Sequence, residues 1–253
     1  MSRTGVDRGP ALTGAATLVG LFVLLELAIR VGLVDRYVVP PPSEVITSFG
    51  RIVTEENIPQ RFAQTALEGL GAGVLITIVG VPLGVLLYRR MVLRAAVQSW
   101  VAALAAAPLV LAYPLFLVIF GRSAWTIVMM GFVSGVAPVI LKTLEGLTAT
   151  RRVLIDVGRS LKLTPMQQFR LVLLPAAVPT IFVGLRLGLI FALINVVGLE
   201  FLINFGGLGQ LINELAERYD LPGTYAAIAF VVLVSVLFFA GLERTERWLR
   251  PGR

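Results

Sequence analysis

Long apolar segments constrain the fold of this chain more than any other feature of its sequence. A helix needs about 20 apolar residues to cross a bilayer. Hydrophobic residues make up 57% of the chain and charged residues only 15%, which leaves too little polar surface for a soluble domain. We therefore predict an all-α membrane protein with six spans, namely Ala11–Val34, Ala63–Tyr88, Ala95–Phe120, Ala124–Leu141, Pro175–Phe205 and Tyr225–Leu242.

Basic residues are distributed unevenly over the ends of these spans. With six spans, fifteen of the 22 Lys and Arg residues fall on the side that holds both termini. Cytoplasmic loops carry an excess of Lys and Arg, so we expect both termini in the cytoplasm. We therefore attribute the net charge of +7 to membrane topology and not to nucleic-acid binding. The expected partner of the apolar surface is the lipid bilayer. The fifteen residues are Arg3, Arg8, Arg89, Arg90, Arg94, Lys142, Arg151, Arg152, Arg159, Lys162, Arg170, Arg244, Arg247, Arg250 and Arg253.

The residue types that are missing exclude several kinds of chemistry. The chain has no Cys and no His, so it lacks thiolate nucleophiles, disulfides, the commonest metal ligand and the usual general base. We expect no metal site and no catalytic residue. The phosphate-binding pattern G-x-x-x-x-G-K-[ST] is absent as well. The chain is therefore not expected to be an enzyme.

Prolines, glycines and one acidic residue shape the first two spans. The first span is expected to stay in the membrane as a signal anchor, and its Glu26 is expected to find a structural partner. Pro40–Pro42 end this helix, and Ser43 is predicted to cap a short amphipathic helix that runs past Phe49. Glycines of the second span predict close packing against other helices; these are Gly69, Gly71, Gly73, Gly80 and Gly84.

The segment Arg151–Pro175 is a polar, basic arm between two apolar blocks. Its charged residues alternate with apolar ones, as in short amphipathic helices at a bilayer surface; a solvated loop is the alternative. Thr164, Pro165 and Gln167 have the spacing of a capping box with proline at the first helical position. The arm is therefore predicted to hold two short helices, with a break near Lys162–Thr164.

Several stretches resemble the membrane subunit of ATP-binding-cassette (ABC) importers, in particular the permeases of the nitrate, sulfonate and taurine type. The arm resembles the EAA loop that these permeases dock into their ATPase, and it is the most specific match. The others are VVPPPSEV, APLVLAYP, VAPVILKTLEGL, LPAAVPTIFVGLRLGL and GLEFLINFGGLGQLI, which lie in the right order between Val38 and Ile212.

The resemblance implies a multi-pass protein of the bacterial inner membrane, with a single transmembrane domain over residues 1–253 and the type I importer permease fold. Its parts would be an N-terminal span (1–37), an extracytoplasmic connection (38–62) and a core permease domain (63–253) with a coupling loop (143–175). The implied partners are a cytoplasmic ABC ATPase dimer that holds ATP and Mg, a second permease subunit and an extracytoplasmic solute-binding protein. The implied coupling residues are Asp156, Val157, Gly158, Arg159, Ser160, Leu161, Lys162, Leu163 and Thr164.

The arm departs from the family pattern at two places. Asp156, Val157 and Gly158 stand where the family has Glu-Ala-Ala, and Lys162 stands where it has a loop glycine. A lysine adopts the left-handed conformations open to glycine only at some energetic cost. Glu68 also occupies a position where relatives commonly carry a basic residue. These departures leave open whether the second permease subunit is identical or a paralogue.

Residues inside the expected spans are candidates for the translocation path. Ionisable groups in a membrane usually face a bundle interior or a water-filled path. The prolines Pro108 and Pro114 are predicted to break or kink the third span in its interior, which could expose backbone to a path. Each candidate has a structural alternative: an ion pair with a neighbouring helix, an interhelical hydrogen bond for the asparagine, or a buried aromatic. The candidates are Tyr113, Arg186, Asn195 and Glu200.

Two other classes of function stay open at this point. An ion-coupled secondary transporter would be independent of nucleotide, and it usually shows repeated halves; none is detectable between Met1–Phe120 and Gly121–Arg253. A membrane scaffold or regulator would move no solute, and the altered coupling loop is compatible with it. The leading prediction is the permease subunit of an ABC importer for a small solute such as a sulfonate or nitrate.

Overall fold

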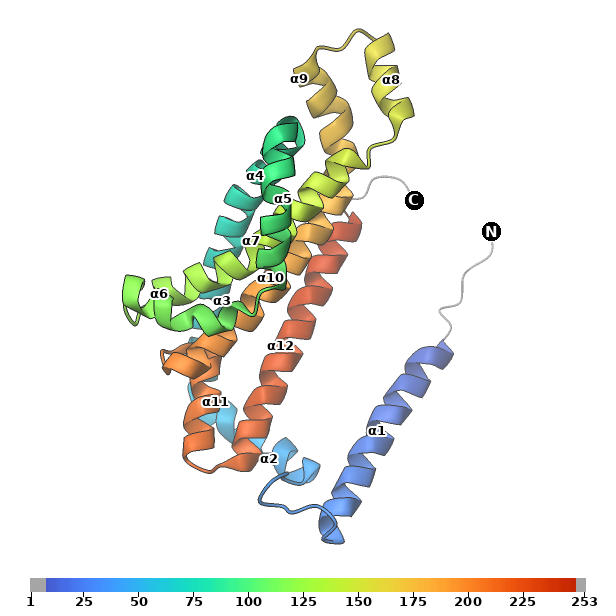
Figure 1. The fold of residues 1–253 in the computed structure, drawn as a ribbon. Coiled ribbons are helices and arrows are strands. Elements are labelled where there is room, and N and C mark those ends of the chain that lie inside the picture. The colour runs from blue at the N-terminus through green and yellow to red at the C-terminus, as the bar shows by residue number, and fades with distance from the viewer. Residues whose placement is uncertain (1–7, 249–253) are drawn as a thin grey trace. The chain divides into compact units, whose positions relative to one another are not determined.

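The structure, a computed structural model, describes residues 8–248. Every regular element in this part of the chain is helical (Figure 1). In order these are α1 (Arg8–Arg30), α2 (Pro42–Glu55), α3 (Ile58–Leu75), η1 (Ile76–Gly80), α4 (Val81–Arg89), α5 (Met91–Ala106), η2 (Leu109–Ala112), α6 (Tyr113–Phe120), α7 (Ala124–Thr148), α8 (Arg152–Ser160), α9 (Pro165–Gln168), η3 (Phe169–Leu173), α10 (Leu174–Ile203), α11 (Gly207–Glu217) and α12 (Leu221–Trp248).

Five helical segments of the described residues are long and apolar enough to cross a membrane. A sixth passes the same test only as a pair, Met91–Ala106 with Leu109–Phe120, which is bent by 91°. The prediction of an all-α fold with six spans is confirmed with this pair as the third span. The flanking residues Arg3, Arg250 and Arg253 lie outside the described residues. The five segments are Leu12–Arg30, Ile58–Arg89, Ala124–Thr148, Pro165–Ile203 and Leu221–Arg244.

Pro108 marks the break in the third span. α5 ends at Ala106, and the 3₁₀ turn η2 leads from the proline into α6. Because proline has no N–H and its ring clashes with the preceding turn, it ends a helix that would otherwise continue. Pro114 was expected to break the span too, but it lies in the first turn of α6, where its missing N–H would have no partner in any case. The span is thus broken as predicted, with Pro108 at the break and Pro114 at the start of the helix that follows it.

Glycines bring the second span close to its neighbours. α3, η1 and α4 form one helical segment, in which η1 is a single π-helical turn. A Cβ added at Gly73 would lie 2.7 Å from Leu189 Cδ2 of α10, and one at Gly84 would lie 2.5 Å from Thr143 Cβ of α7. Real Cβ atoms do not come this close to other heavy atoms. The packing role predicted for these glycines is confirmed.

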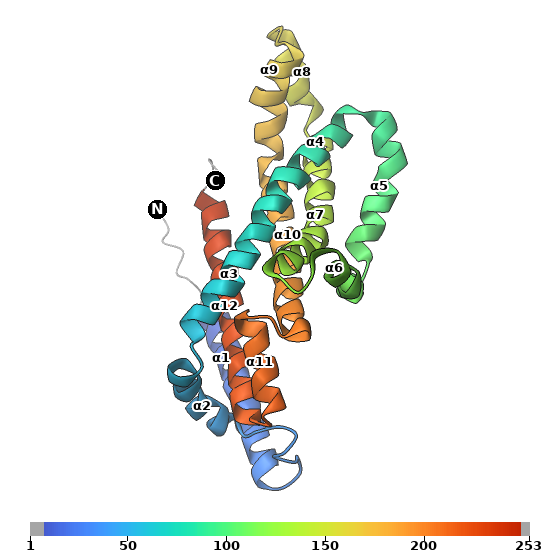
Figure 2. The same cartoon turned by 90° about the vertical axis from the view of Figure 1, so that its left-hand side faces the viewer.

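α7 and α10 form the centre of the helix bundle. α4, α5 and η1 contact α7, and Figure 2 shows α5 on the outer side of this group. At the centre, a Cβ added at Gly188 would lie 2.7 Å from the carbonyl oxygen of Gly135 and 2.8 Å from Val139 Cγ2. The two backbones therefore approach so closely that only hydrogen atoms fit between them, as in tightly packed membrane helices.

The described residues form two compact units. The first contains the residues up to Pro59 together with Leu211–Val231, and the second contains Gln60–Gln210 and the residues from Val232 onward. In the first unit, α2 packs its apolar face on α11 and on the start of α12. The core of this unit is made of Ile52, Ile58, Leu211, Leu215, Ala226 and Ala227.

An ion pair connects two elements of the first unit. The guanidinium of Arg51 on α2 donates a hydrogen bond to the carboxylate of Asp220, which also accepts the backbone N–H of Gly223 at 3.1 Å. The hydrogen bond to Asp220 raises the pKa of Arg51 above its ordinary value, so the pair stays charged at every physiological pH. Asp220 therefore caps the first turn of α12 and holds it to α2.

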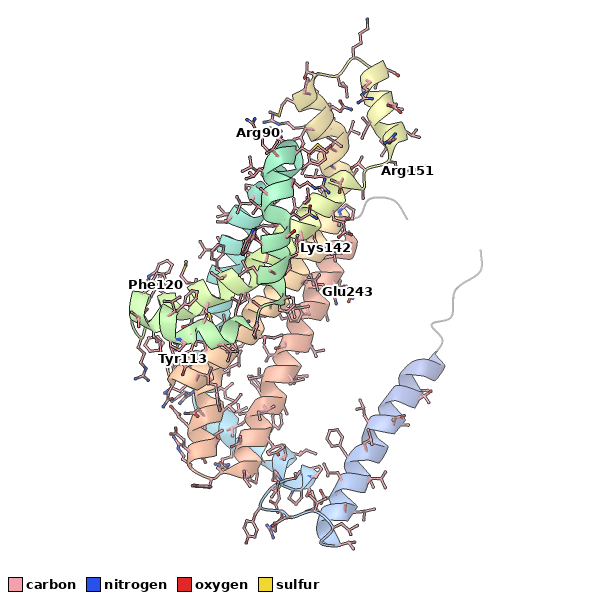
Figure 3. All side chains as sticks on the ribbon, viewed as in Figure 1. Arg90, Tyr113, Phe120, Lys142, Arg151 and Glu243 are labelled. Carbon is pink, nitrogen blue, oxygen red and sulfur yellow. The ribbon has the colours of Figure 1, made fainter. Side chains whose placement is uncertain are left out.

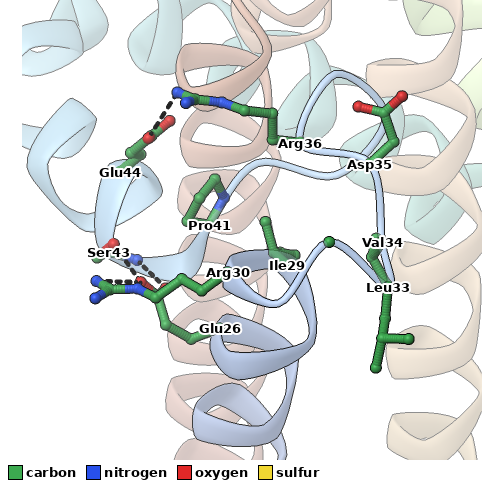
Figure 4. A pocket seen from close by; sticks show the side chains of 11 residues that line it. Glu26, Ile29, Arg30, Leu33, Val34, Asp35, Arg36, Pro41, Ser43 and Glu44 are labelled. Atoms are coloured by element: carbon green, nitrogen blue, oxygen red, sulfur yellow. Dashed lines mark hydrogen bonds and ion pairs between the residues drawn. The ribbon is translucent and has the colours of Figure 1, made fainter.

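The predicted partner of Glu26 is found on the connection to α2 (Figure 4). Glu26 accepts hydrogen bonds from the hydroxyl of Ser43 at 2.8 Å and from its backbone N–H at 3.1 Å, and it pairs with Arg30 at 2.8 Å. The structural pairing expected for Glu26 is confirmed. The capping role expected for Ser43 is wrong, because α2 begins one residue earlier at Pro42 and the serine hydroxyl is bound to Glu26.

Candidate functional site

The polar arm between α7 and α10 is a helical hairpin (Figures 1 and 3). α8 runs outward, the chain turns at Leu161–Lys162, and α9 and η3 return to the bundle. Arg151 is labelled at the base of α8, and Arg90 lies at this same end of the bundle, whereas Tyr113 and Phe120 lie well away from it. The arm and these basic residues therefore lie at one end of the bundle, and η2 and α6 lie away from it.

The returning half of the arm is continuous with the fifth span. Pro165–Ile203 forms one helical segment of 39 residues, whereas the sequence predicted a separate short helix ending before Pro175. The π-helical turn η3 lies directly before that proline. A π turn widens the backbone and accommodates a missing N–H without ending the helix, which is why the proline does not separate the two helices.

The break between the two halves of the arm lies where the sequence predicted it. Gln167 N–H donates to Thr164 Oγ1 at 3.3 Å, and Thr164 N–H donates to Gln167 Oε1 at 2.9 Å. This confirms the capping box. α8 ends in a Schellman motif, in which Leu163 N–H donates to the Gly158 carbonyl and Lys162 N–H to the Arg159 carbonyl. Two local motifs therefore fix the turn between α8 and α9.

Lys162 occupies the left-handed residue of the Schellman motif, with φ +52°. Left-handed backbone places Cβ near the carbonyl oxygen, which costs roughly 1 kcal/mol that glycine does not pay. We expect Lys162→Gly to stabilise the turn by about 0.5 to 1 kcal/mol and to slow hydrogen–deuterium exchange of α8. Lys162→Ala is the control, because it removes the charge and keeps the Cβ. An equal gain in both variants would contradict this explanation.

One face of α8 packs on the returning half of the arm. Gly158 is buried, and Ile155 is half-buried. Gln168 Nε2 donates to the Ile155 carbonyl at 3.0 Å. A Cβ added at Gly158 would meet Leu163 Cδ1 at 3.5 Å, an ordinary van der Waals distance. The glycine at this position is therefore not required by space, and an alanine such as the family carries would fit.

The opposite face of α8 is apolar and exposed. The exposed fraction is 63% for Val153, 52% for Val157 and 68% for Leu161. Asp156 and Arg159 lie beside them and form an ion pair at 3.4 Å, with side chains that are 64% and 72% exposed. Such an exposed pair contributes little to stability, because both charges remain hydrated. This mixture of apolar and charged groups on a projecting helix is typical of a protein contact.

An aromatic contact joins the arm to the end of the second span. The Arg89 guanidinium lies 4.5 Å from the ring centroid of Phe169, a cation–π distance. Both residues line a cavity of about 520 Å³, together with Tyr88, Met166 and Leu173. Sequence reasoning missed this contact, since it treated Arg89 only as a topology signal. Arg89 and Phe169 lie far apart in the sequence, so no short sequence pattern predicts their contact.

The candidate path residues lie in different environments. Tyr113 packs on the buried cluster around Ile127 and Leu199, and it also lines a cavity of about 590 Å³ with Arg122 and Asn204. The structure places it at the break of the third span, as expected. Asn195 was expected to bond to another helix, but its Nδ2 donates to the Phe191 carbonyl of its own helix at 2.9 Å.

Arg186 and Glu200 lie on the same helix and have different partners. Arg186 is 3.9 Å from Glu243 of α12, and both side chains are partly exposed. This is the structural pairing that the sequence analysis gave as one alternative. Glu200 is fully buried and accepts hydrogen bonds from the Thr65 hydroxyl at 3.0 Å and from the Gly209 N–H at 2.8 Å. The structure does not bring the four candidates together into one site.

Comparisons with known proteins agree with this architecture. Residues 76–251 match the family model described as the binding-protein-dependent transport system inner membrane component. The formylaminopyrimidine transport permease protein ThiX of Halalkalibacterium halodurans is 26% identical over 92% of both chains. The taurine transport system permease protein TauC of Escherichia coli is 24% identical over 93% of this chain and 87% of its own.

A solved structure with a similar fold is the inward-facing MetNI methionine ABC transporter. The TM-score is 0.67 at 22% sequence identity, over 76% of this chain and 96% of that chain. The likeness establishes the fold of an importer permease. The chain therefore belongs to the binding-protein-dependent transport system inner membrane component family, and it is a multi-pass membrane permease subunit of an ABC importer.

Proposed function

We propose that the segment Asp156–Thr164 is the surface through which this permease subunit receives the force of ATP hydrolysis. The observation that carries the proposal is the exposed apolar and charged face of α8 on an arm that projects from the bundle. A helix that leaves Val157 and Leu161 more than half exposed gains from a protein partner. The partner is a separate cytoplasmic ABC ATPase dimer, which holds ATP and Mg.

The proposed assembly contains two further proteins. A second permease subunit, identical or a paralogue, completes the pore, and an extracytoplasmic solute-binding protein delivers the solute. The bilayer covers the apolar outer faces of the spans, where Trp100 and Val118 are 77% and 84% exposed. The cytoplasmic assignment of the arm and of both termini rests on the excess of Lys and Arg in the segments that six spans put on one side.

The proposed substrate is a small solute such as a sulfonate or nitrate. The relatives are named for formylaminopyrimidine, taurine and bicarbonate, which have small size in common. Of the four path candidates, Tyr113 has the best support because it lines a cavity at the broken span. Arg186, Asn195 and Glu200 stay predictions for the path.

Exchanging the two charges of α8 tests the coupling surface. The double variant Asp156→Arg/Arg159→Asp keeps an ion pair within the helix but reverses the charge that faces a partner. We expect the permease to fold normally, because both side chains are exposed, and we expect at least a tenfold loss of ATPase co-purification and of ATP-driven solute uptake into proteoliposomes.

The matched control for this variant is Arg36→Glu/Glu44→Arg, which likewise exchanges the two charges of an exposed ion pair, here in the first unit. It is expected to leave both readouts unchanged. If the charge-exchanged protein kept wild-type ATPase binding and uptake, the coupling assignment would be wrong. Uptake that continues without nucleotide would instead favour an ion-coupled transporter, and intact ATPase binding without any solute flux would favour a scaffold.

A further inference from the structure

Two carboxyl groups face each other inside the second unit. Glu68 projects from α3 and Glu200 from α10, and their carboxyl groups lie close enough to interact with one another. Their residues are only 4% and 0% exposed. Acidic residues are almost never buried to this degree without a partner of opposite charge. The pair therefore needs a physical explanation.

The hydrogen-bond donors around the pair satisfy only half of its oxygens. Thr65 Oγ1 and Gly209 N–H donate to Glu200 Oε2, and Gln64 Nε2 donates to Glu68 Oε1 at 3.2 Å. The other two oxygens, Glu200 Oε1 and Glu68 Oε2, are buried and have no donor. Two ionised carboxylates can only accept hydrogen bonds. They therefore cannot hydrogen-bond to each other unless one of them carries a proton.

No cation compensates the two carboxyl groups within the described residues. In the second unit, the other charged side chains on α3 and α10 are Arg61 and Arg186. Tyr113 packs on the cluster that holds Leu199, and Arg122 binds the Asn204 carbonyl just beyond α10. The groups that act on the two carboxyl groups are Gln64, Thr65, Gly209 and the carboxyl groups themselves, and no cation is among them. Arg122 itself lies 6.0 Å from the Phe205 ring centroid.

The turn between α10 and α11 closes over the pair. Gly206 and Gly207 both have positive φ, at +69° and +72°. A Cβ added at Gly207 would collide with the Glu200 carboxyl group, and one at Gly206 would collide with the Gln64 amide. Leu208 N–H also donates to Thr65 Oγ1 at 2.9 Å. The glycines therefore let the backbone approach the acidic pair and seal it from water.

We propose that Glu68 and Glu200 share a single bound proton, and that this carboxyl–carboxylate pair is a proton-binding site that fastens α3 to the α10–α11 turn. A proton between the groups supplies the missing donor for the two free oxygens and removes the repulsion between two like charges at close range. Loss of the proton would leave two buried negative charges and open the turn. This proposal does not depend on the coupling role of α8.

The sign of the pH effect follows from the proton count. In the unfolded chain both glutamates are solvated and ionised above about pH 6, whereas the folded chain keeps one proton on the pair. Folding therefore takes up a proton, and raising the pH lowers the stability of the folded state. The expected decrease is roughly 3 to 5 °C in apparent Tm for each pH unit above about pH 6 until the folded pair itself loses the proton.

Infrared spectroscopy and thermal melts of the whole purified subunit in detergent test the proposal. At about pH 8, where exposed carboxyl groups are ionised, the wild type should show the carbonyl stretch of a protonated carboxyl group. Glu68→Gln should abolish it, because the amide N–H donates to an ionised Glu200 and no shared proton is needed. The apparent Tm of this variant should no longer show the decrease above about pH 6 that is expected of the wild type.

Two further variants keep the test decisive. Glu200→Gln should abolish the band in the same way if Glu68→Gln does not fold. Glu145→Gln, which alters an exposed glutamate paired with Lys142, should keep both the band and the pH dependence of the wild type. Absence of the band in the wild type overturns the proposal without any variant. A band that survives in both Glu68→Gln and Glu200→Gln overturns it as well.

Discussion

Replacing Gly188 with valine is expected to lower the apparent Tm of the purified subunit by roughly 5 to 10 °C, or to prevent its accumulation in the membrane. The first atom of the new side chain would lie 2.7 Å from the Gly135 carbonyl oxygen of α7 and 2.8 Å from Val139 Cγ2. A flexible side chain could move aside, but a backbone carbonyl inside a helix cannot. The two central helices must therefore separate, which loses contacts along their whole length.

Gly198 provides a matched control on the same helix. No heavy atom lies within 4 Å of a Cβ built there, so Gly198→Val changes helix propensity in the same way without a collision. Fluorescence-monitored melts and size-exclusion profiles of both variants in one detergent separate the two effects. Equal destabilisation at the two positions would mean that the close approach of α7 and α10 contributes nothing specific.

Truncating Ile52 to alanine is expected to destabilise the first unit by about 2 to 4 kcal/mol. Ile52 is fully buried in the core that α2 forms with α11 and α12. Loss of its side chain leaves a cavity. The ion pair between Arg51 and Asp220 holds α2 at a fixed distance from the start of α12, so the helices cannot close this cavity. Hydrogen–deuterium exchange of α2 and α11 should become faster.

Ile46 on the same helix provides the comparison for Ile52. It is 71% exposed, so Ile46→Ala removes the same atoms without creating a cavity and should leave exchange in α2 and α11 unchanged. The second unit should exchange at wild-type rates in both variants. Fast exchange throughout the whole chain in Ile52→Ala would show that the two units do not unfold separately.

Features set by short-range rules were predictable from the sequence. The spans follow from apolar length alone, and the turn of the arm follows from the capping box of Thr164 and Gln167. The left-handed conformation of Lys162 agrees with its place where relatives carry glycine. In each case the determining contacts lie within about five residues, so the pattern of neighbours contains the information.

Features set by distant residues were not predictable. Arg89 meets Phe169, and Glu68 meets Glu200, across large sequence separations, and no local pattern selects one partner among many. The wrong predictions for Ser43 and Asn195 arose because each side chain has more than one possible hydrogen-bond partner. Ser43 can cap a helix or bind Glu26, and Asn195 can bond to its own helix or to another; the choice depends on which acceptor the fold brings near.

The unbroken segment Pro165–Ile203 has a mechanical consequence. At 1.5 Å per residue its 39 residues span about 58 Å, so it behaves as a lever that reaches from the tip of the arm to the buried Glu200. A tilt of about 10° around its middle displaces each end by roughly 5 Å in opposite directions. If the segment moves as one body, motion at the arm would move the α10–α11 turn in the opposite direction.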